Sequence, residues 1–251
     1  MSRRRAGGLC SVSKPYWDRG CKVLGLQLVN PTAGLFSGDR LGMDVIIGPR
    51  AQVAMTSPSA TRFHTMPKGQ AVVSQNFHIA GEAWLDFWPE ILIPQKDSDV
   101  VQVTKIHLED TASMVYFDSL APGRLAHKEN FQFRRLETRL EIMQGDELVA
   151  KERCVLSPET GKWPLQVPDW KACYYGAIWI AGPRAEQVIL DIQSDGFIDE
   201  VSRYGASLLS PKLGVLRIIS PSSLLMKRAA DHFRGIMKNR LPLLQMDFRK
   251  I

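Results

Sequence analysis

The chain has few of the features that mark a disulfide scaffold, a metal site or a membrane anchor. Its 4 cysteines lie far apart and form no CxxC pair, so we expect no disulfide framework and a reducing compartment. Its 5 histidines form no HxH, HxxxH or HExxH pattern, which argues against a zinc-type site. The longest apolar run, near residues 173–181, is too short to cross a bilayer. These absences predict a soluble, cytoplasmic protein.

Catalytic signatures are missing as well. The chain has no GxxxxGK[ST] loop to hold a phosphate, and the segment around Ser37 lacks the first glycine of a GxSxG nucleophile elbow. Carboxylate pairs suited to glycoside hydrolysis could form among the 26 Asp and Glu residues, but the sequence selects none of them. We therefore predict a protein that is not an enzyme. The alternative is a carbohydrate- or ester-active hydrolase built on a β-helix.

The net charge of +6 is spread along the chain. Basic clusters such as Arg134–Arg135 are short and are not interleaved with aromatic residues, so we expect no nucleic-acid surface. The lack of a long apolar segment argues against a membrane partner. A basic balance is compatible with docking on acidic proteins.

Residues 22–156 are dominated by strand-like patterns. In the segment Val73–Ile79, apolar and polar side chains largely alternate, which predicts one buried and one exposed face. A faint repeat places a turn, an alanine and an apolar strand at Ala51, Ala83 and Ala112, with spacings of 32 and 29 residues. Such a period fits stacked β-coils around a shared core, or else successive hairpins of a β-sandwich.

The last third of the chain predicts two helices. The first, at residues 195–209, would begin at Asp195 and bury apolar residues spaced three or four apart. The second, at 222–239, would be capped by Ser222 and end before Pro242. Its apolar stripe would comprise Leu225, Ala229, Phe233 and Ile236, and its solvent face Lys227, Arg228, Asp231 and Arg234.

The fold class that follows is mainly β, with helically wound, stacked strands and two C-terminal α-helices. We expect residues 1–21 to be disordered or atypical and residues 22–251 to form a single β-rich domain. An aromatic group at Trp84, Phe87 and Trp88 and the helix at 222–239 are candidate partner surfaces. The alternative for the aromatic group is ordinary core, which is the commoner place for such residues.

The segment VNPTAGLFSGDRL, residues 29–41, is the most informative motif. Gly34 and Gly38 interrupt an apolar run, and the charged pair Asp39 and Arg40 follows. Glycine reaches positive φ and permits close approach of backbone, so the segment predicts a shaped polar corner. Asp39 could stabilise the turn itself or face an internal polar path.

Three further polar residues are candidates for such a path. Asp118 follows an apolar strand and could cap a turn or project into the interior. Glu152 lies between two bases, but strand alternation puts it on the opposite face, together with Ala150 and Cys154. Thr61 could offer a hydroxyl group or belong to a turn.

Residues 29–41 resemble the NPxGGLxGGDxL signature of the UreD/UreH family of urease accessory proteins, with Ala33 and Ser37 in place of two glycines. The resemblance continues in four ordered segments: SATRFH (59–64), LDFWPEILIP (85–94), FDSLAPGR (117–124) and LETRLEIMQGDELVAKERCVL (136–156). It implies an extended, wound β-body with a C-terminal helical element.

The resemblance also implies a function. Such proteins are scaffolds for the insertion of nickel into apo-urease, and they work with a helical accessory protein and, through it, a nickel-carrying GTPase. By this resemblance Asp39, Asp118 and Glu152 would line a transient nickel path. Thr61, Gly34, Gly38 and Arg40 would belong to that path or to its turns. No cofactor would be bound stably, because scattered oxygen ligands let Ni²⁺ exchange.

Overall fold

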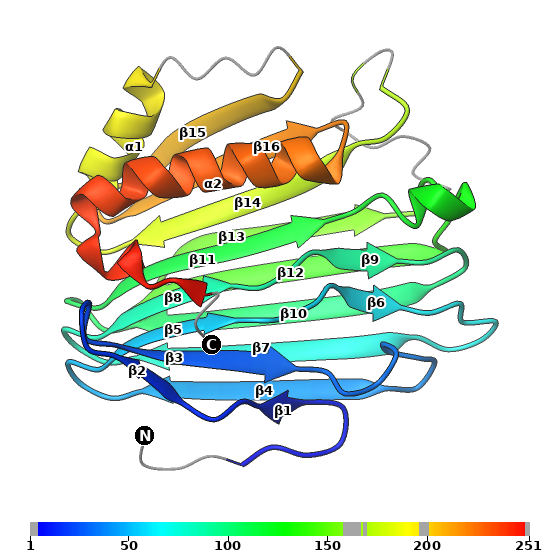
Figure 1. The fold of residues 1–251 in the computed structure, drawn as a ribbon, viewed down its shortest axis with the longest axis horizontal. Helices are drawn as coiled ribbons and strands as arrows, with labels where there is room; N and C mark the ends of the chain where they lie inside the picture. The colour runs from blue at the N-terminus through cyan, green and yellow to red at the C-terminus, as the bar shows by residue number, and fades with distance from the viewer. Residues whose placement is uncertain (1–4, 158–166, 168–169, 196–200, 249–251) are drawn as a thin grey trace.

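The computed structural model describes residues 5–157, 167, 170–195 and 201–248 of the 251-residue chain. Two β-sheets face each other, and two helices cover the strands at one side of the larger sheet (Figure 1). The smaller sheet has the strand order β13-β12-β10-β7-β4. Its strands are β4 (Arg40–Ile47), β7 (Ala71–Ile79), β10 (Asp99–Leu108), β12 (Arg135–Gln144) and β13 (Glu147–Leu156).

The larger sheet runs in the order β1-β3-β5-β8-β11-β14-β16-β15, with β2, β6 and β9 attached at its sides. Its strands are β1 (Ser11–Val12), β2 (Tyr16–Asp18), β3 (Val23–Val29), β5 (Gln52–Thr56), β6 (Thr61–Phe63), β8 (Trp84–Trp88), β9 (Leu92–Pro94), β11 (Ser113–Leu120), β14 (Tyr174–Ala181), β15 (Arg203–Ser210) and β16 (Leu213–Ser220). The helices are α1 (Ala185–Ser194) and α2 (Ser223–Arg240), with short 3₁₀ turns at Leu125–His127 and Pro242–Gln245.

The chain winds between the two sheets, so the predicted β-coils are confirmed. It passes from β4 to β5, from β7 to β8 and from β10 to β11, each time changing sheet. Equivalent strands of successive coils pair in parallel: Trp84 pairs with Gln52 on one side and with Ser113 on the other. These partners are separated by the same 32 and 29 residues as the alanine repeat. The alternative of successive hairpins is wrong for this part of the chain.

Strand alternation directs apolar side chains into the space between the sheets. Phe77 packs at 5.1 Å from Phe87 and 5.9 Å from Tyr116, measured between ring centroids. His78, the next residue along β7, is exposed. Trp84 and Phe87 are also buried, so for these two residues the core interpretation is correct and the partner-surface interpretation is wrong.

The two C-terminal helices are present, but the first lies earlier than predicted. Helix α1 ends at Ser194, and Asp195 is its C-cap, not the N-cap of a following helix. Residues 203–210 form strand β15, and residues 196–200 lie outside the described part of the chain. Tyr204 and Leu208 misled the prediction because a spacing of four residues fits one face of a helix and one face of a strand equally well.

Helix α2 begins as predicted. The Ser222 side chain accepts a hydrogen bond from the Leu225 N–H at 3.2 Å and caps the helix. Its polar face differs from the prediction, because Arg234 is buried and not exposed to solvent. The guanidinium binds both carboxylate oxygens of Asp86 on β8 and lies 4.6 Å from the ring centroid of Trp88. This buried ion pair connects α2 to strand β8 of the larger sheet.

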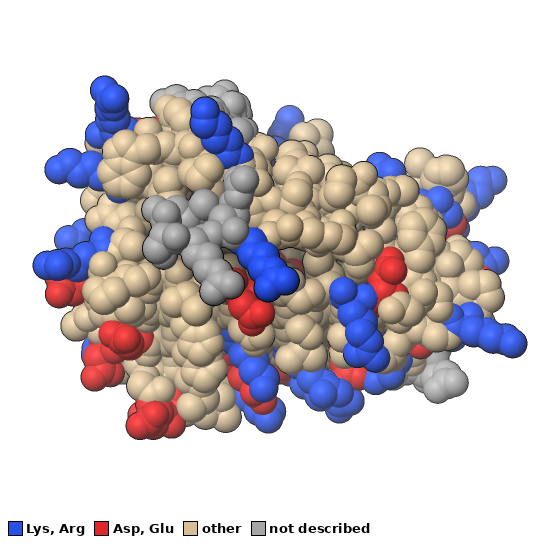
Figure 2. Space-filling view, turned by 90° about the horizontal axis from the view of Figure 1, so that it is seen from below, with Lys and Arg blue, Asp and Glu red and all other residues tan. Residues whose placement is uncertain are grey.

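The N-terminal segment joins the larger sheet. Strands β1 and β2 both pair antiparallel with β3, so the part of residues 1–21 that contains them is ordered. Within the described residues, no helix is both long enough and apolar enough to span a membrane. Seen from below, basic side chains are interspersed with acidic ones and form no single continuous patch (Figure 2).

Candidate functional site

A cavity of about 290 Å³ lies between the two sheets. Its position follows from the strand sequences. On the inner face of β10, Gln102 and Thr104 interrupt a row that is apolar at both ends, at Val100 and at Ile106. The cavity therefore separates two apolar clusters of the core. The polar side chains in its wall are Gln102, Thr104, Tyr116, Asp118, Ser119, Thr138, Arg139, Glu152, Arg153, Tyr175 and Arg217.

Asp118 projects from β11 into this cavity. Gln102 Nε2 donates a hydrogen bond to Asp118 Oδ2 at 3.1 Å. Burial raises the pKa of Asp118 to about 7, and the negative charge of Glu152 adds to the rise. Hydrogen bonds from the Ser119 backbone and from Gln102 act in the opposite direction. Near neutral pH this carboxyl group is therefore poised between its protonated and ionised forms.

Glu152 enters the cavity from the opposite sheet. As strand alternation predicted, it shares the inner face of β13 with Cys154. Its neighbour Lys151 instead pairs with Glu141 of β12 at 2.9 Å. Glu152 forms an ion pair with Arg217 of β16, so a single contact bridges the two sheets. The cavity wall thus carries two carboxylates, and Arg217 pairs directly with one of them, whereas the wall residues Arg139 and Arg153 pair with Glu137.

Two tyrosines complete the polar wall. Burial raises the pKa of the Tyr116 phenol far above its usual range and also raises that of Tyr175. Both groups therefore remain protonated and can donate hydrogen bonds. Tyr116 donates to Gln75 Oε1 at 3.1 Å, and Thr104 donates to the same oxygen at 3.1 Å.

Asp39 does not line this cavity. Its carboxylate accepts a hydrogen bond from the Phe36 N–H at 2.7 Å, which is the turn-stabilising arrangement. Arg40 is exposed at the start of β4, and Thr61 begins the short strand β6. Of the residues selected from the sequence, the structure brings together Asp118 and Glu152. It leaves out Asp39, Thr61, Gly34, Gly38 and Arg40.

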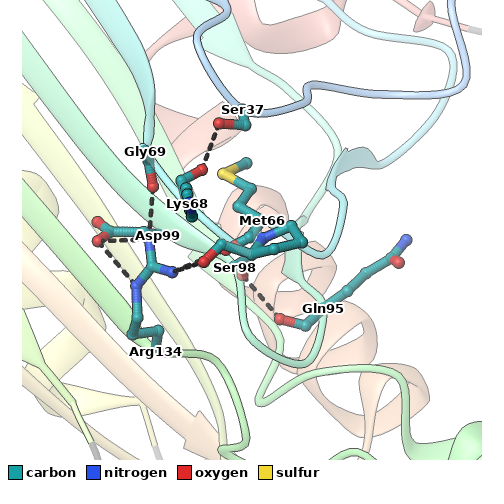
Figure 3. Close-up of polar contacts among 9 residues, drawn as sticks. Ser37, Met66, Lys68, Gly69, Gln95, Ser98, Asp99 and Arg134 are labelled. Atoms are coloured by element: carbon teal, nitrogen blue, oxygen red, sulfur yellow. Dashed lines mark hydrogen bonds and ion pairs between the residues drawn. The ribbon is translucent and has the colours of Figure 1, made fainter.

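The glycine signature forms a corner stacked on the next coil. Gly34 has a φ of +144°, and the following residue, Leu35, donates its N–H to the Arg62 carbonyl at 2.8 Å. The Phe36 ring stacks on His64 with centroids 4.3 Å apart. Nearby, Ser37 Oγ donates to the Lys68 carbonyl (Figure 3). The signature is therefore explained by close packing between neighbouring coils.

Arg134 holds the same corner from the other side. Its Nη1 donates to the Met66 carbonyl at 2.7 Å, and its Nε donates to Asp99 at 3.2 Å (Figure 3). A further bond reaches the Gly69 carbonyl. One side chain thus satisfies backbone groups of the loop that leads into β7.

Replacing Gly34 by alanine should lower the free energy of unfolding by at least about 2 kcal/mol. A Cβ at this position would overlap the Arg62 carbonyl oxygen, and the positive φ disfavours any L side chain. Gly42 on β4 provides the control, because a Cβ there meets nothing within 4 Å. Gly42→Ala should change stability by no more than about 0.5 kcal/mol in the same urea titration. Equal effects of the two substitutions would contradict the packing argument.

Sequence reasoning missed Arg217, Gln102 and Tyr175. Arg217 had a usable signal, since it is the charged residue in the apolar strand LGVLRIIS (213–220). Gln102 and Tyr175 had weaker ones, because single polar residues are common in half-buried strands. Their role depends on the pairing of distant strands.

Asp118 and Glu152 offer oxygen ligands. Within residues 5–157, 167, 170–195 and 201–248, no group of three or more His, Cys, Asp and Glu side chains is arranged to hold a metal ion. At about 30 Å³ per molecule, the volume is on the order of ten waters. The wall thus offers two carboxylates as oxygen donors, beside the guanidinium groups of Arg139, Arg153 and Arg217.

A family model for the UreD urease accessory protein matches residues 1–247. The chain belongs to the UreD family. It is 31% identical over 246 residues to the urease accessory protein UreD of Opitutus terrae, covering 96% of this chain and 89% of that protein. Over 160 residues it is 31% identical to UreD of Halalkalibacterium halodurans, with 63% and 59% of the two chains covered. The urease accessory protein UreH of Helicobacter acinonychis is 28% identical over 182 residues, covering 70% of this chain and 69% of that protein.

UreD membership matches the resemblance seen in residues 29–41. The residues of the signature corner and of the cavity both lie within the range that the family model matches.

Proposed function

We propose that this protein is a non-enzymatic urease maturation factor that escorts Ni²⁺ to apo-urease. Membership of the UreD family supports a role in urease maturation. The observation that carries the nickel part is the cavity that Asp118 and Glu152 line from different sheets. The protein would work in the cytoplasm with a helical accessory protein and, through it, a nickel-carrying GTPase.

The physical argument concerns the hydration of the ion. Stripping a divalent cation of its water costs far more than a few protein contacts return, so a passage must remain wet. A cavity with room for several waters and two carboxylates meets this condition. Oxygen ligands from only two side chains leave the ion exchangeable, whereas a complete His or Cys cage would retain it. The proposal therefore rests on Asp118 and Glu152, and no longer on Asp39.

The combined substitution Asp118→Asn and Glu152→Gln should lower urease activation about tenfold in cells grown at limiting nickel. Both changes keep the side-chain volume and remove the charge that attracts the cation. Urease activity per apo-urease is the measurement. Co-purification with apo-urease and the accessory proteins should be unchanged, since both substituted groups line the cavity and neither is fully exposed.

Glu141→Gln provides a matched control for this experiment. The Glu141 side chain is 32% exposed, close to the 28% of the Glu152 side chain. Glu141 pairs with Lys151, however, and does not line the cavity. This variant should retain wild-type activation. Full activation by the double cavity variant would contradict the nickel path.

One observation favours a second candidate, a hydrolase. Two carboxyl groups lie in one cavity, and the raised pKa of Asp118 is typical of a general acid. Incubation of the purified protein with panels of polysaccharides and esters separates the two functions. Turnover that disappears in Asp118→Asn would establish the hydrolase, and the scaffold predicts no turnover.

A further inference from the structure

Arg217 is the cation that pairs with a carboxylate of the cavity wall. Arg139 and Arg153 also touch the wall, but both direct a guanidinium N–H to Glu137, which does not line it. The guanidinium of Arg217 instead binds Glu152. Arg217 therefore occupies the carboxylate that an incoming cation would need as a ligand.

The strand register places Arg217 in one row with Asp118. Ala177 of β14 pairs with Asp118 on one side and with Arg217 on the other. The two charged residues are thus two strands apart, and only a methyl group lies between them. The side chains of Arg217 and Glu152 are 42% and 28% exposed, which places their ion pair at the rim of the cavity.

We propose that Arg217 is a resident counter-cation that neutralises Glu152 while the cavity is empty and gives up this carboxylate when a divalent cation enters. This inference rests on the proposed function and concerns how the same site is regulated. A divalent ion carries twice the charge of the guanidinium, so it competes for Glu152 at close range. When the ion leaves, the arginine takes the carboxylate back.

Arg217 also lies beside an aromatic ring of the wall. Its guanidinium carbon lies 5.6 Å from the Trp179 ring centroid. Tyr175, Ala177 and Trp179 share one face of β14, because strand side chains alternate. An arginine that releases Glu152 would therefore still have an aromatic ring beside it. Such competition would keep the ion weakly held, as delivery requires.

The test is titration of purified full-length protein with Ni²⁺ by calorimetry at neutral pH. Arg217→Met removes the charge but keeps an apolar stem against Trp179, and it should bind Ni²⁺ roughly tenfold more tightly than the wild type. Arg217→Lys keeps the charge and should stay within about threefold of the wild-type dissociation constant. Near-ultraviolet circular dichroism checks that each variant is folded.

The possible results separate the inference from the proposed function. Unchanged or weaker binding in Arg217→Met, with normal binding in the wild type, overturns the counter-cation role and leaves the nickel path standing. Absence of Ni²⁺ binding in both proteins overturns both. Glu152→Gln should weaken binding in the wild-type background. If it does not, the ion binds elsewhere, and both the role of Arg217 and the nickel path are overturned.

Discussion

Replacing Arg234 by methionine should lower the free energy of unfolding by about 3–5 kcal/mol. Its partner Asp86 is fully buried, and the Arg234 side chain is only 8% exposed. Without the guanidinium, two carboxylate oxygens would lose their bidentate partner in a place that water does not reach. The cost arises from leaving one charge unpaired, and equilibrium unfolding in urea measures it.

Two controls separate this mechanism from a general sensitivity of α2. Arg228→Met, at an exposed position of the same helix, should alter stability by no more than about 0.5 kcal/mol. Combining Arg234→Met with Asp86→Leu should recover most of the loss, because a buried ion pair can be exchanged for apolar side chains at little cost. A loss below about 1 kcal/mol for Arg234→Met alone would show that the pair is not needed to hold α2 on the coil.

The coiled body was predictable because its repeat is local. Each coil places an alanine and an apolar strand at a similar spacing, and parallel stacking of equivalent strands preserves that spacing as register. The position of α1 was not predictable in this way, since Tyr204 and Leu208 satisfy both periodicities. Arg234 was misplaced because a charged residue on an amphipathic helix is ordinarily solvated, and its partner Asp86 lies 148 residues away.

In the candidate site, too, some features could be predicted from the sequence and others could not. Glu152 was placed on the inner face by alternation within a single strand. Its contact with Arg217 spans 65 residues and depends on how β13 and β16 are brought face to face. Asp39 belongs to a motif whose close packing is itself sufficient to explain its glycines and its carboxylate. A local motif thus indicates the family, while the polar side chains of the cavity come from six strands.

The free energy of unfolding of Asp118→Asn, taken as the difference from wild type, should be higher at pH 8 than at pH 5 by on the order of 3 kcal/mol. The pKa of Asp118 is raised from 3.8 to about 7 in the folded protein, chiefly by burial. Between these values the folded state holds a proton that the unfolded state has released. Wild-type stability therefore falls as the pH rises from about 4 towards 7, because a buried carboxylate must ionise. Asparagine does not titrate, so the variant lacks this loss.

The difference between variant and wild type isolates Asp118, because all other titrations are shared to a first approximation. Thr138→Val is the matched control: it also alters the cavity wall but introduces no titratable group. Its effect on unfolding should be equal at the two pH values. If the Asp118→Asn difference were also independent of pH, Asp118 would be ionised throughout this range. Its carboxylate would then be available to a cation without release of a proton.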